Sequence, residues 1–144
     1  MDIIVYKGKL DINQAEVILH GKVVAQLATA KLKNCQPHVV PVWFLWDGES
    51  IIISGFISTR KIKELTRNPR CSILVNSDLG ASHAVLLEGV AEVFDRPSQY
   101  IYEQSVKVYT KYMGEGAKDA EPQSWAKDME NRIVKLTPKV VYAW

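Results

Sequence analysis

The chain has 144 residues, of which 47% are hydrophobic and 24% charged, a composition typical of one globular domain. Its formal net charge of +2 is too small to indicate binding to nucleic acid or to a membrane surface. The longest apolar run, 39–46, is far too short to span a bilayer, and the first residues, MDII, lack the pattern of a signal peptide. We therefore expect a single cytoplasmic domain over residues 1–144.

The cysteine and histidine residues give no indication of a metal site. Neither the two cysteines, Cys35 and Cys71, nor the three histidines have the spacing of a set of metal ligands. In a reducing compartment we expect both cysteines to be free thiols.

Hydrophobic patterning predicts six strands. The second and third strands flank Asp47-Gly48, a dipeptide that favours a tight hairpin turn. Their nearly continuous apolar character predicts burial on both faces, whereas the last strand alternates between apolar and polar residues. In chain order, the predicted strands cover residues 22–33, 38–46, 50–55, 71–77, 84–94 and 134–143.

Helix signals occur at four places, at residues 12–20, 60–67, 97–113 and 122–131. Asp11 can cap the first helix, Ser58 or Thr59 the second, and Pro97 suits the first position of the third. The third helix has a wide apolar face that is rich in tyrosine. Six strands with short connections and a few outer helices predict an antiparallel β-barrel, whose closure hides the sheet edges.

The start of the helix 60–67 is the strongest candidate for a binding site. A helix N-terminus offers free N–H groups and a dipole that favours an anion. Arg60 can bind two phosphate oxygens at once, and Lys61 adds a second positive charge. Ser58 and Thr59 add hydroxyl donors. The pattern indicates a phosphate site, and two alternatives stay open: a solvated helix face, and a nucleic-acid surface, for which interleaved aromatic residues are missing.

Three aromatic residues of the second predicted strand are candidates for contact with a ligand. Trp43 and Phe44 are adjacent and must face opposite sides of the strand, and Trp46 follows two residues later. Core packing is the simplest interpretation of each, although one of them can instead form the wall against a flat ring. The sequence shows no Ser/His/Asp or Cys/His arrangement, so no catalytic acid or base is assigned.

Five segments, taken together, resemble a known family. They are PHVVPVWFLWDGESIIISG, STRKIKEL, NPRCSILV, LLEGVAEVF and the terminal LTPKVVYAW. In this order and spacing they resemble the pyridoxamine 5'-phosphate oxidase-like family of FMN-binding split β-barrel proteins. The resemblance covers about residues 23–94 and 134–144.

The resemblance implies a mainly β fold, a six-stranded antiparallel split β-barrel with Greek-key topology, that forms a homodimer with two FMN molecules at the interface. Arg60 and Lys61 would bind the FMN phosphate with help from Ser58 and Thr59. The residues that would run along the ring and ribityl chain are Val40, Pro41, Val42 and Trp43. Those that would line the phosphate side are Ser54 and Gly55. Those that would complete the pocket of the second protomer are Asn76, Ser77 and Trp125.

The function implied by this resemblance is that of an FMN-dependent oxidoreductase, which transfers hydride or electrons between a reduced donor and a small substrate. Related subfamilies bind an 8-hydroxy-5-deazaflavin coenzyme in the same groove, and a flavin carrier without turnover is a further alternative. The oxidase proper has basic and histidine residues in a C-terminal region that this sequence does not match, which argues against oxidation of vitamin B6.

Overall fold

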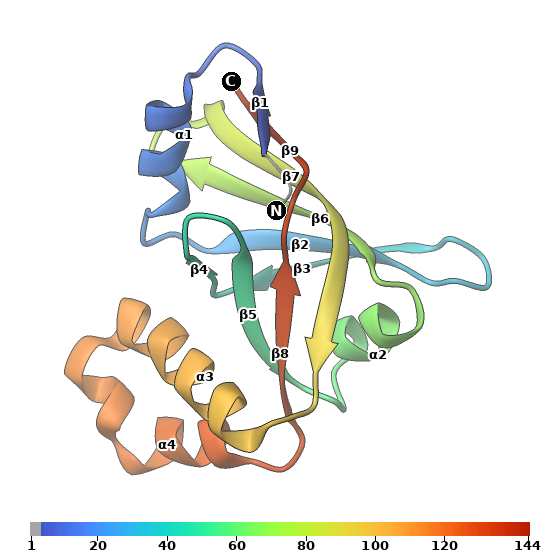
Figure 1. Cartoon of the computed structure of the whole chain (residues 1–144), viewed down its shortest axis with the longest axis vertical. Helices are drawn as coiled ribbons and strands as arrows, with labels where there is room; N and C mark the ends of the chain where they lie inside the picture. Colours follow the sequence, from blue (N-terminus) through green and yellow to red (C-terminus); the bar gives the residue numbers. More distant parts are fainter. Residues whose placement is uncertain (1–3) are drawn as a thin grey trace.

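The protein is built on one sheet of nine strands, which a computed structural model describes together with four helices over residues 4–144 (Figure 1). Residues 1–3 lie outside this range, and with them most of the segment from which we expect no signal peptide. The strands are β1 (Val5–Lys7), β2 (Ala25–Ala30), β3 (Pro37–Val42), β4 (Leu45–Trp46), β5 (Ile51–Phe56), β6 (Arg70–Ser77), β7 (Gly80–Phe94), β8 (Asn131–Leu136) and β9 (Val140–Ala143). The helices are α1 (Ile12–Leu19), α2 (Arg60–Arg67), α3 (Ser98–Met113) and α4 (Ala120–Lys127), with the 3₁₀ turn η1 (Gly114–Lys118) between the last two.

The long strand β7 connects the two parts of the sheet. The strand order is β3-β2-β6-β7-β8-β5-β4, with antiparallel neighbours throughout, and β9 also pairs with β7 and carries β1 parallel to it. The first part of β7 pairs with β6 and β9, and its last residues, 91–94, pair with β8. Gly89 lies where the partner changes, and a Cβ atom there would be 2.9 Å from Cδ1 of Leu136. A mainly antiparallel sheet with a few helices is therefore present, as predicted.

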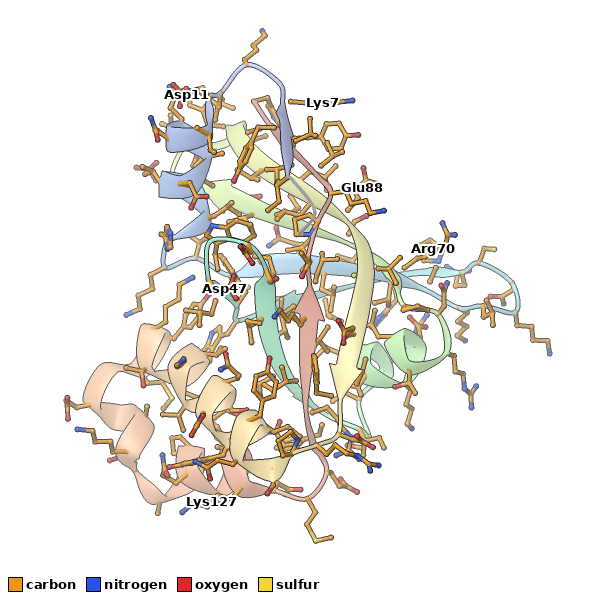
Figure 2. All side chains as sticks on the ribbon, viewed as in Figure 1. Lys7, Asp11, Asp47, Arg70, Glu88 and Lys127 are labelled. Carbon is orange, nitrogen blue, oxygen red and sulfur yellow. The ribbon has the colours of Figure 1, made fainter. Side chains whose placement is uncertain are left out.

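Two hydrophobic clusters lie on opposite sides of β5. Ile51 and Ile53 point into the barrel with Leu27, whereas Ile52 packs with Ile133 under α3 and α4. Side chains fill the space between α3 and β5, and both helices lie outside the barrel, as expected (Figure 2). Within residues 4–144, no helix combines the length and the apolar character that crossing a membrane requires.

The prediction of burial on both faces is correct for β5 and wrong for β3. On β3 the side chains alternate, so that Pro37, Val39 and Pro41 are exposed. The helices α1 and α2 contribute to the core inside the barrel, and the outer side of β3 has no covering element within the described chain.

The six predicted strands become nine because two of them break and one more is present. The strand predicted over 38–46 is interrupted at Trp43-Phe44, which leave the hydrogen-bond ladder of the sheet between β3 and β4. The strand predicted over 134–143 is interrupted at 137–139, between β8 and β9, where Pro138 lacks a backbone donor. The short β1 was not predicted. Residues 80–83 of the segment 78–83, which was predicted as a loop, belong to β7, and Gly80 pairs with Ser77 beyond a bulge at the end of β6.

Candidate functional site

A groove of about 440 Å³ lies between β3, β5, α2 and α3. Five residues expected at the cofactor line it, namely Pro41, Val42, Trp43, Ser54 and Lys61. The other lining residues are Val24, Val108 and Tyr109, which the sequence did not single out as site residues. The groove therefore brings the hairpin and the start of α2 together, and adds one face of α3.

Stacked aromatic rings form one wall of this groove. Trp43 is 37% exposed and stacks on Tyr112, with ring centroids 4.8 Å apart and planes 4° apart. Tyr109 meets Trp43 edge-on at 6.5 Å, and Trp125 of α4 meets Tyr109 edge-on at 5.7 Å. Phe44, in contrast, is fully buried in the core. Trp43 is thus the residue of the predicted strand that presents a flat ring to the groove.

Two residues of α3 hold the strand break that carries Trp43. The hydroxyl of Tyr112 accepts a hydrogen bond from the Phe44 N–H at 3.2 Å and donates one to the Val23 carbonyl at 2.7 Å. Nζ of Lys111 donates to the Phe44 carbonyl at 3.0 Å and lies 3.6 Å from the centre of the Phe44 ring. Burial lowers the pKa of Lys111 to about 8. These contacts satisfy backbone groups that the break removes from the sheet ladder.

Lys61 brings a positive charge into the groove. Its side chain lies across Gly55, and within residues 4–144 it takes part in no ion pair. Burial lowers the pKa of Lys61 because the charged ammonium loses water. An anion bound in the groove would supply the counter-charge that Lys61 lacks within the described residues.

Arg60 points to the other side of α2. Its Nε donates to Oε1 of Glu64 at 2.8 Å, a contact that leaves both terminal nitrogens of the guanidinium without a hydrogen-bond partner in the described chain. With Ser58 it lines a second groove of about 720 Å³, whose other cations come from α2 and from the segment after β2. The two predicted phosphate ligands therefore stand on either side of the start of α2.

Glu64 is a buried carboxylate that the sequence did not single out. It also accepts a hydrogen bond from the Thr29 hydroxyl at 2.5 Å, and Nδ1 of His38 lies 3.9 Å away. Burial alone would raise the pKa of Glu64, but the hydrogen bonds from Thr29 and Arg60 and the charges of Arg60 and His38 outweigh it and lower the pKa. Its spacing of four residues from Arg60 on one helix was the available signal.

Thr59 occupies the N-cap position of α2, as expected, but does not cap it with its side chain. Its hydroxyl donates to the Phe56 carbonyl at 2.7 Å instead of accepting from the helix. In the part of the chain that the structure describes, no side chain caps the free N–H groups at the start of α2, which leaves them available to another acceptor.

The remaining predicted residues do not line the groove within one chain. Val40 packs against the core inside the barrel, and Gly55 lies beneath Lys61. Asn76 and Ser77 lie at the bulged end of β6, and the Ser77 hydroxyl accepts from the Leu79 N–H at 3.1 Å. Trp125, described above, stands behind Tyr109.

Comparison with known proteins supports this picture of the fold. A family model described as pyridoxamine 5'-phosphate oxidase matches residues 13–144, and no curated protein matches the chain. A conserved hypothetical protein of Mycobacterium tuberculosis is similar in structure, with a TM-score of 0.76 at 23% identity over 94% of this chain and 85% of the other. An F420 reductase gives 0.70 at 22% identity over 88% and 94%, and a FAD-binding protein of Mesorhizobium loti gives 0.67 at 20% identity over 92% of each chain.

These solved structures share the fold, which confirms the predicted class of an antiparallel split β-barrel. The family match extends over the barrel, the groove and the helices α3 and α4. The chain belongs to the pyridoxamine 5'-phosphate oxidase family.

Proposed function

We propose that this protein binds FMN in the groove beside Trp43 and Lys61 and acts as an oxidoreductase, which transfers hydride or electrons between a reduced donor and a small substrate. The observation that carries the proposal is Lys61, which lines an aromatic groove and takes part in no ion pair within the described residues 4–144. The groove volume of about 440 Å³ falls within the range of ligand pockets, about 300–1,000 Å³. The FAD-binding protein and the F420 reductase among the similar structures support a coenzyme of the flavin type.

The residues of the groove fit the two ends of such a coenzyme. Trp43, supported by Tyr112, offers an apolar face to a flat ring. Lys61 and the uncapped start of α2 offer positive charge and N–H donors to the phosphate. We propose that Arg60, whose terminal nitrogens have no partner within the described chain, turns from the neighbouring groove toward the same anion. Ser58, beside Arg60, adds a hydroxyl donor, whereas the Thr59 hydroxyl already donates its proton to the Phe56 carbonyl. The bound flavin would supply the redox chemistry, and the protein would hold and orient it.

We further propose a homodimer that closes the groove. In register across β3, β2, β6, β7, β9 and β1, one outward row consists of Pro41, Gln26, Leu74, Leu86, Tyr142 and Lys7. Most of this row is apolar, it lies on the side of the sheet opposite to the core, and it begins at a residue that lines the groove. In the next row Val39 is 60% exposed. A second copy seated on this face would cover the apolar surface and place its own residues beside the coenzyme.

The 8-hydroxy-5-deazaflavin coenzyme is the second candidate for the groove, because an F420 reductase is among the similar structures. It would use the same wall at Trp43 and the same cation at Lys61. A flavin carrier without turnover is the third candidate, because no residue of the groove is assigned as a catalytic acid or base.

Absorption spectra and ligand titrations test these proposals. Freshly purified protein is expected to be yellow, or to quench FMN fluorescence on titration, and NADH or NADPH is expected to reduce the bound flavin. A protein that is colourless and takes up no FMN contradicts the main proposal. Tighter binding of the deazaflavin in a competing titration favours the second candidate, and a bound flavin that no nicotinamide reduces favours the carrier.

The dimer has its own test in two matched variants. Val39→Asp places a charge on the proposed interface, whereas Val17→Asp makes the same change at a residue of α1 that is 74% exposed. Light scattering after size exclusion is expected to show a dimer for the wild type and Val17→Asp and a monomer with weakened FMN binding for Val39→Asp. A monomeric wild type contradicts the proposed assembly.

A further inference from the structure

A buried cluster of polar side chains lies behind the groove and meets it at Tyr109. Its members are Ser54 of β5, Ser105 of α3 and Asn131 of β8, and the last two are 0% and 2% exposed. Ser54 Oγ lies 3.0 Å from Asn131 Oδ1, 3.2 Å from Ser105 Oγ and 3.1 Å from the Tyr109 hydroxyl. Asn131 Nδ2 lies 2.9 Å from Ser105 Oγ, which closes a ring of three side chains.

A backbone carbonyl sets the direction of the hydrogen bonds in this ring. The carbonyl oxygen of Ala126 lies 3.4 Å from Asn131 Nδ2, and since a carbonyl only accepts, the amide nitrogen must face it. Asn131 Oδ1 then faces Ser54 and only accepts, so Ser54 donates its one proton to Asn131. Ser105 accepts from Asn131 and passes its own proton to Ser54.

Ser54 consequently has no proton left for Tyr109. Their contact at 3.1 Å is a hydrogen bond only if the tyrosine hydroxyl donates to Ser54. Reversing it would leave Asn131 Oδ1 buried without a donor, which is costly in an enclosed site. Burial also raises the pKa of Tyr109, so the hydroxyl keeps its proton at neutral pH.

Ser54 has both of its lone pairs occupied by Ser105 and Tyr109, so of the two hydroxyl oxygens that the cluster contributes to the groove only that of Tyr109 offers a free lone pair, and it offers no proton. Lys61 is the opposite kind of group, because its ammonium donates and does not accept. Ser54, Tyr109 and Lys61 line the same groove. The site is thus polarised, with a cation on one lining residue and an enforced acceptor on another.

We propose that Tyr109 is a specificity-determining residue, which accepts a hydrogen bond from an N–H or O–H group of the bound ligand. The ligand class is one that carries an anion for Lys61 and such a donor on the part that lies beside α3. This inference rests on the proposed function and deepens it. In FMN the ring N3–H and the ribityl hydroxyls carry donors of this kind, whereas the ring edge formed by N1 and the C2 carbonyl does not.

The test compares three probes on three proteins. The probes are FMN, 3-methyl-FMN, which lacks the ring N–H, and an analogue with a plain alkyl phosphate chain in place of the ribityl phosphate. The proteins are the wild type, Tyr109→Phe and Tyr102→Phe. Tyr102 is the matched control, since it lies on the same helix and its hydroxyl donates to Gln123 at 2.6 Å, outside the groove.

Tyr109→Phe is expected to weaken FMN binding by about fivefold to tenfold, the value of one net hydrogen bond. One of the two analogues lacks the donor that Tyr109 binds, and Tyr109→Phe should leave the affinity for that analogue unchanged. If that analogue is 3-methyl-FMN, the donor is the ring N–H; if it is the alkyl phosphate analogue, the donor is a ribityl hydroxyl. Tyr102→Phe should change none of the affinities. If Tyr109→Phe weakens the binding of all three probes equally, or does not weaken FMN binding, the inference is overturned. In either case, FMN binding by the wild type still upholds the proposed function.

A second measurement on the ligand-free protein keeps the two proposals separable. NMR is expected to show a slowly exchanging Tyr109 hydroxyl proton with a nuclear Overhauser contact to the β-protons of Ser54. That result together with no FMN binding contradicts the proposed function and supports the acceptor role of Tyr109 towards another ligand. A hydroxyl proton without this contact overturns the inference whatever the protein binds.

Discussion

The side chain of Lys61 lies so closely over Gly55 that a Cβ atom on the glycine would be 2.9 Å from Cε of the lysine. The same atom would be 3.3 Å from Cδ1 of Ile62, a core residue of α2. Gly55 is near the end of β5 and Lys61 is at the start of α2, so the contact joins the hairpin to the helix across a short turn. The absent side chain lets the lysine reach the groove while its stem stays packed on the sheet.

Gly55→Ala should therefore displace Lys61 and weaken FMN binding by about tenfold, the loss of one charge-assisted contact. Gly116→Ala is the control, because a Cβ atom there would have its nearest neighbour at 3.7 Å, an ordinary contact. Fluorescence titration with FMN measures both variants. If Gly55→Ala binds FMN as tightly as the wild type, Lys61 does not need the space above Gly55 to reach the groove.

Tyr112 supports the groove in two ways that substitutions can separate. Tyr112→Phe removes the hydrogen bonds to Phe44 and Val23 but keeps the ring on which Trp43 stacks. We expect it to lower the free energy of unfolding by about 1–2 kcal/mol, since buried backbone groups lose a partner, with little change in FMN affinity. Tyr112→Ala also removes the stacked ring and should weaken FMN binding. Urea unfolding and FMN titration check the two effects, and equal FMN affinities for Phe and Ala would contradict the role of the stack.

Glu64 should make the protein sensitive to acid. Its pKa in the folded state lies below that of an exposed glutamate, so its contribution to stability is present above the ordinary value of about 4.3 and is lost as the pH falls through the lower, folded pKa. Glu64→Gln removes the titrating group and should flatten the fall in the free energy of unfolding below about pH 4. Urea unfolding between neutral and acid pH measures this slope. A slope identical to that of the wild type would assign the acid sensitivity to other carboxylates.

Lys111 should also make stability rise with pH, but on the alkaline side. Burial lowers its pKa to about 8, so the folded state favours the neutral amine. Between this pKa and the ordinary lysine value of about 10.4 the unfolded chain holds more protons, and the contribution of Lys111 to stability rises with pH. The difference in unfolding free energy between the wild type and Lys111→Met should therefore shift in favour of the wild type over this range. A difference independent of pH would contradict the lowered pKa.

Local signals predicted the elements that build the site. The turn at Asp47-Gly48 forms as expected, with Gly48 at φ 97° and Asp47 Oδ1 accepting from two backbone N–H groups. The helix α2 covers the predicted residues 60–67, with Ile62 and Leu65 buried as expected. Both predictions depend on neighbours in the sequence, which is why they succeed.

The contacts made by α3 could not be predicted in the same way. The tyrosine-rich face of this helix was visible in the sequence, but the partners of Tyr109 and Tyr112, Ser54 and Phe44, lie more than 50 residues away along the chain. Periodicity shows which side chains share a face, and it does not show what lies opposite that face. The break at Trp43-Phe44 was missed for the same reason, because the backbone groups it frees are satisfied by α3.

The central claim is that a phosphate is held at the start of α2, and comparison of FMN with riboflavin, which lacks the phosphate, tests it most directly. The wild type should bind FMN at least about tenfold more tightly than riboflavin, because charge-assisted hydrogen bonds hold the phosphate. The variant R60A/K61A should lose this preference while its riboflavin affinity stays close to that of the wild type, and Lys63→Ala, on the same helix, should keep the preference. An R60A/K61A protein that binds FMN as tightly as the wild type would contradict the account.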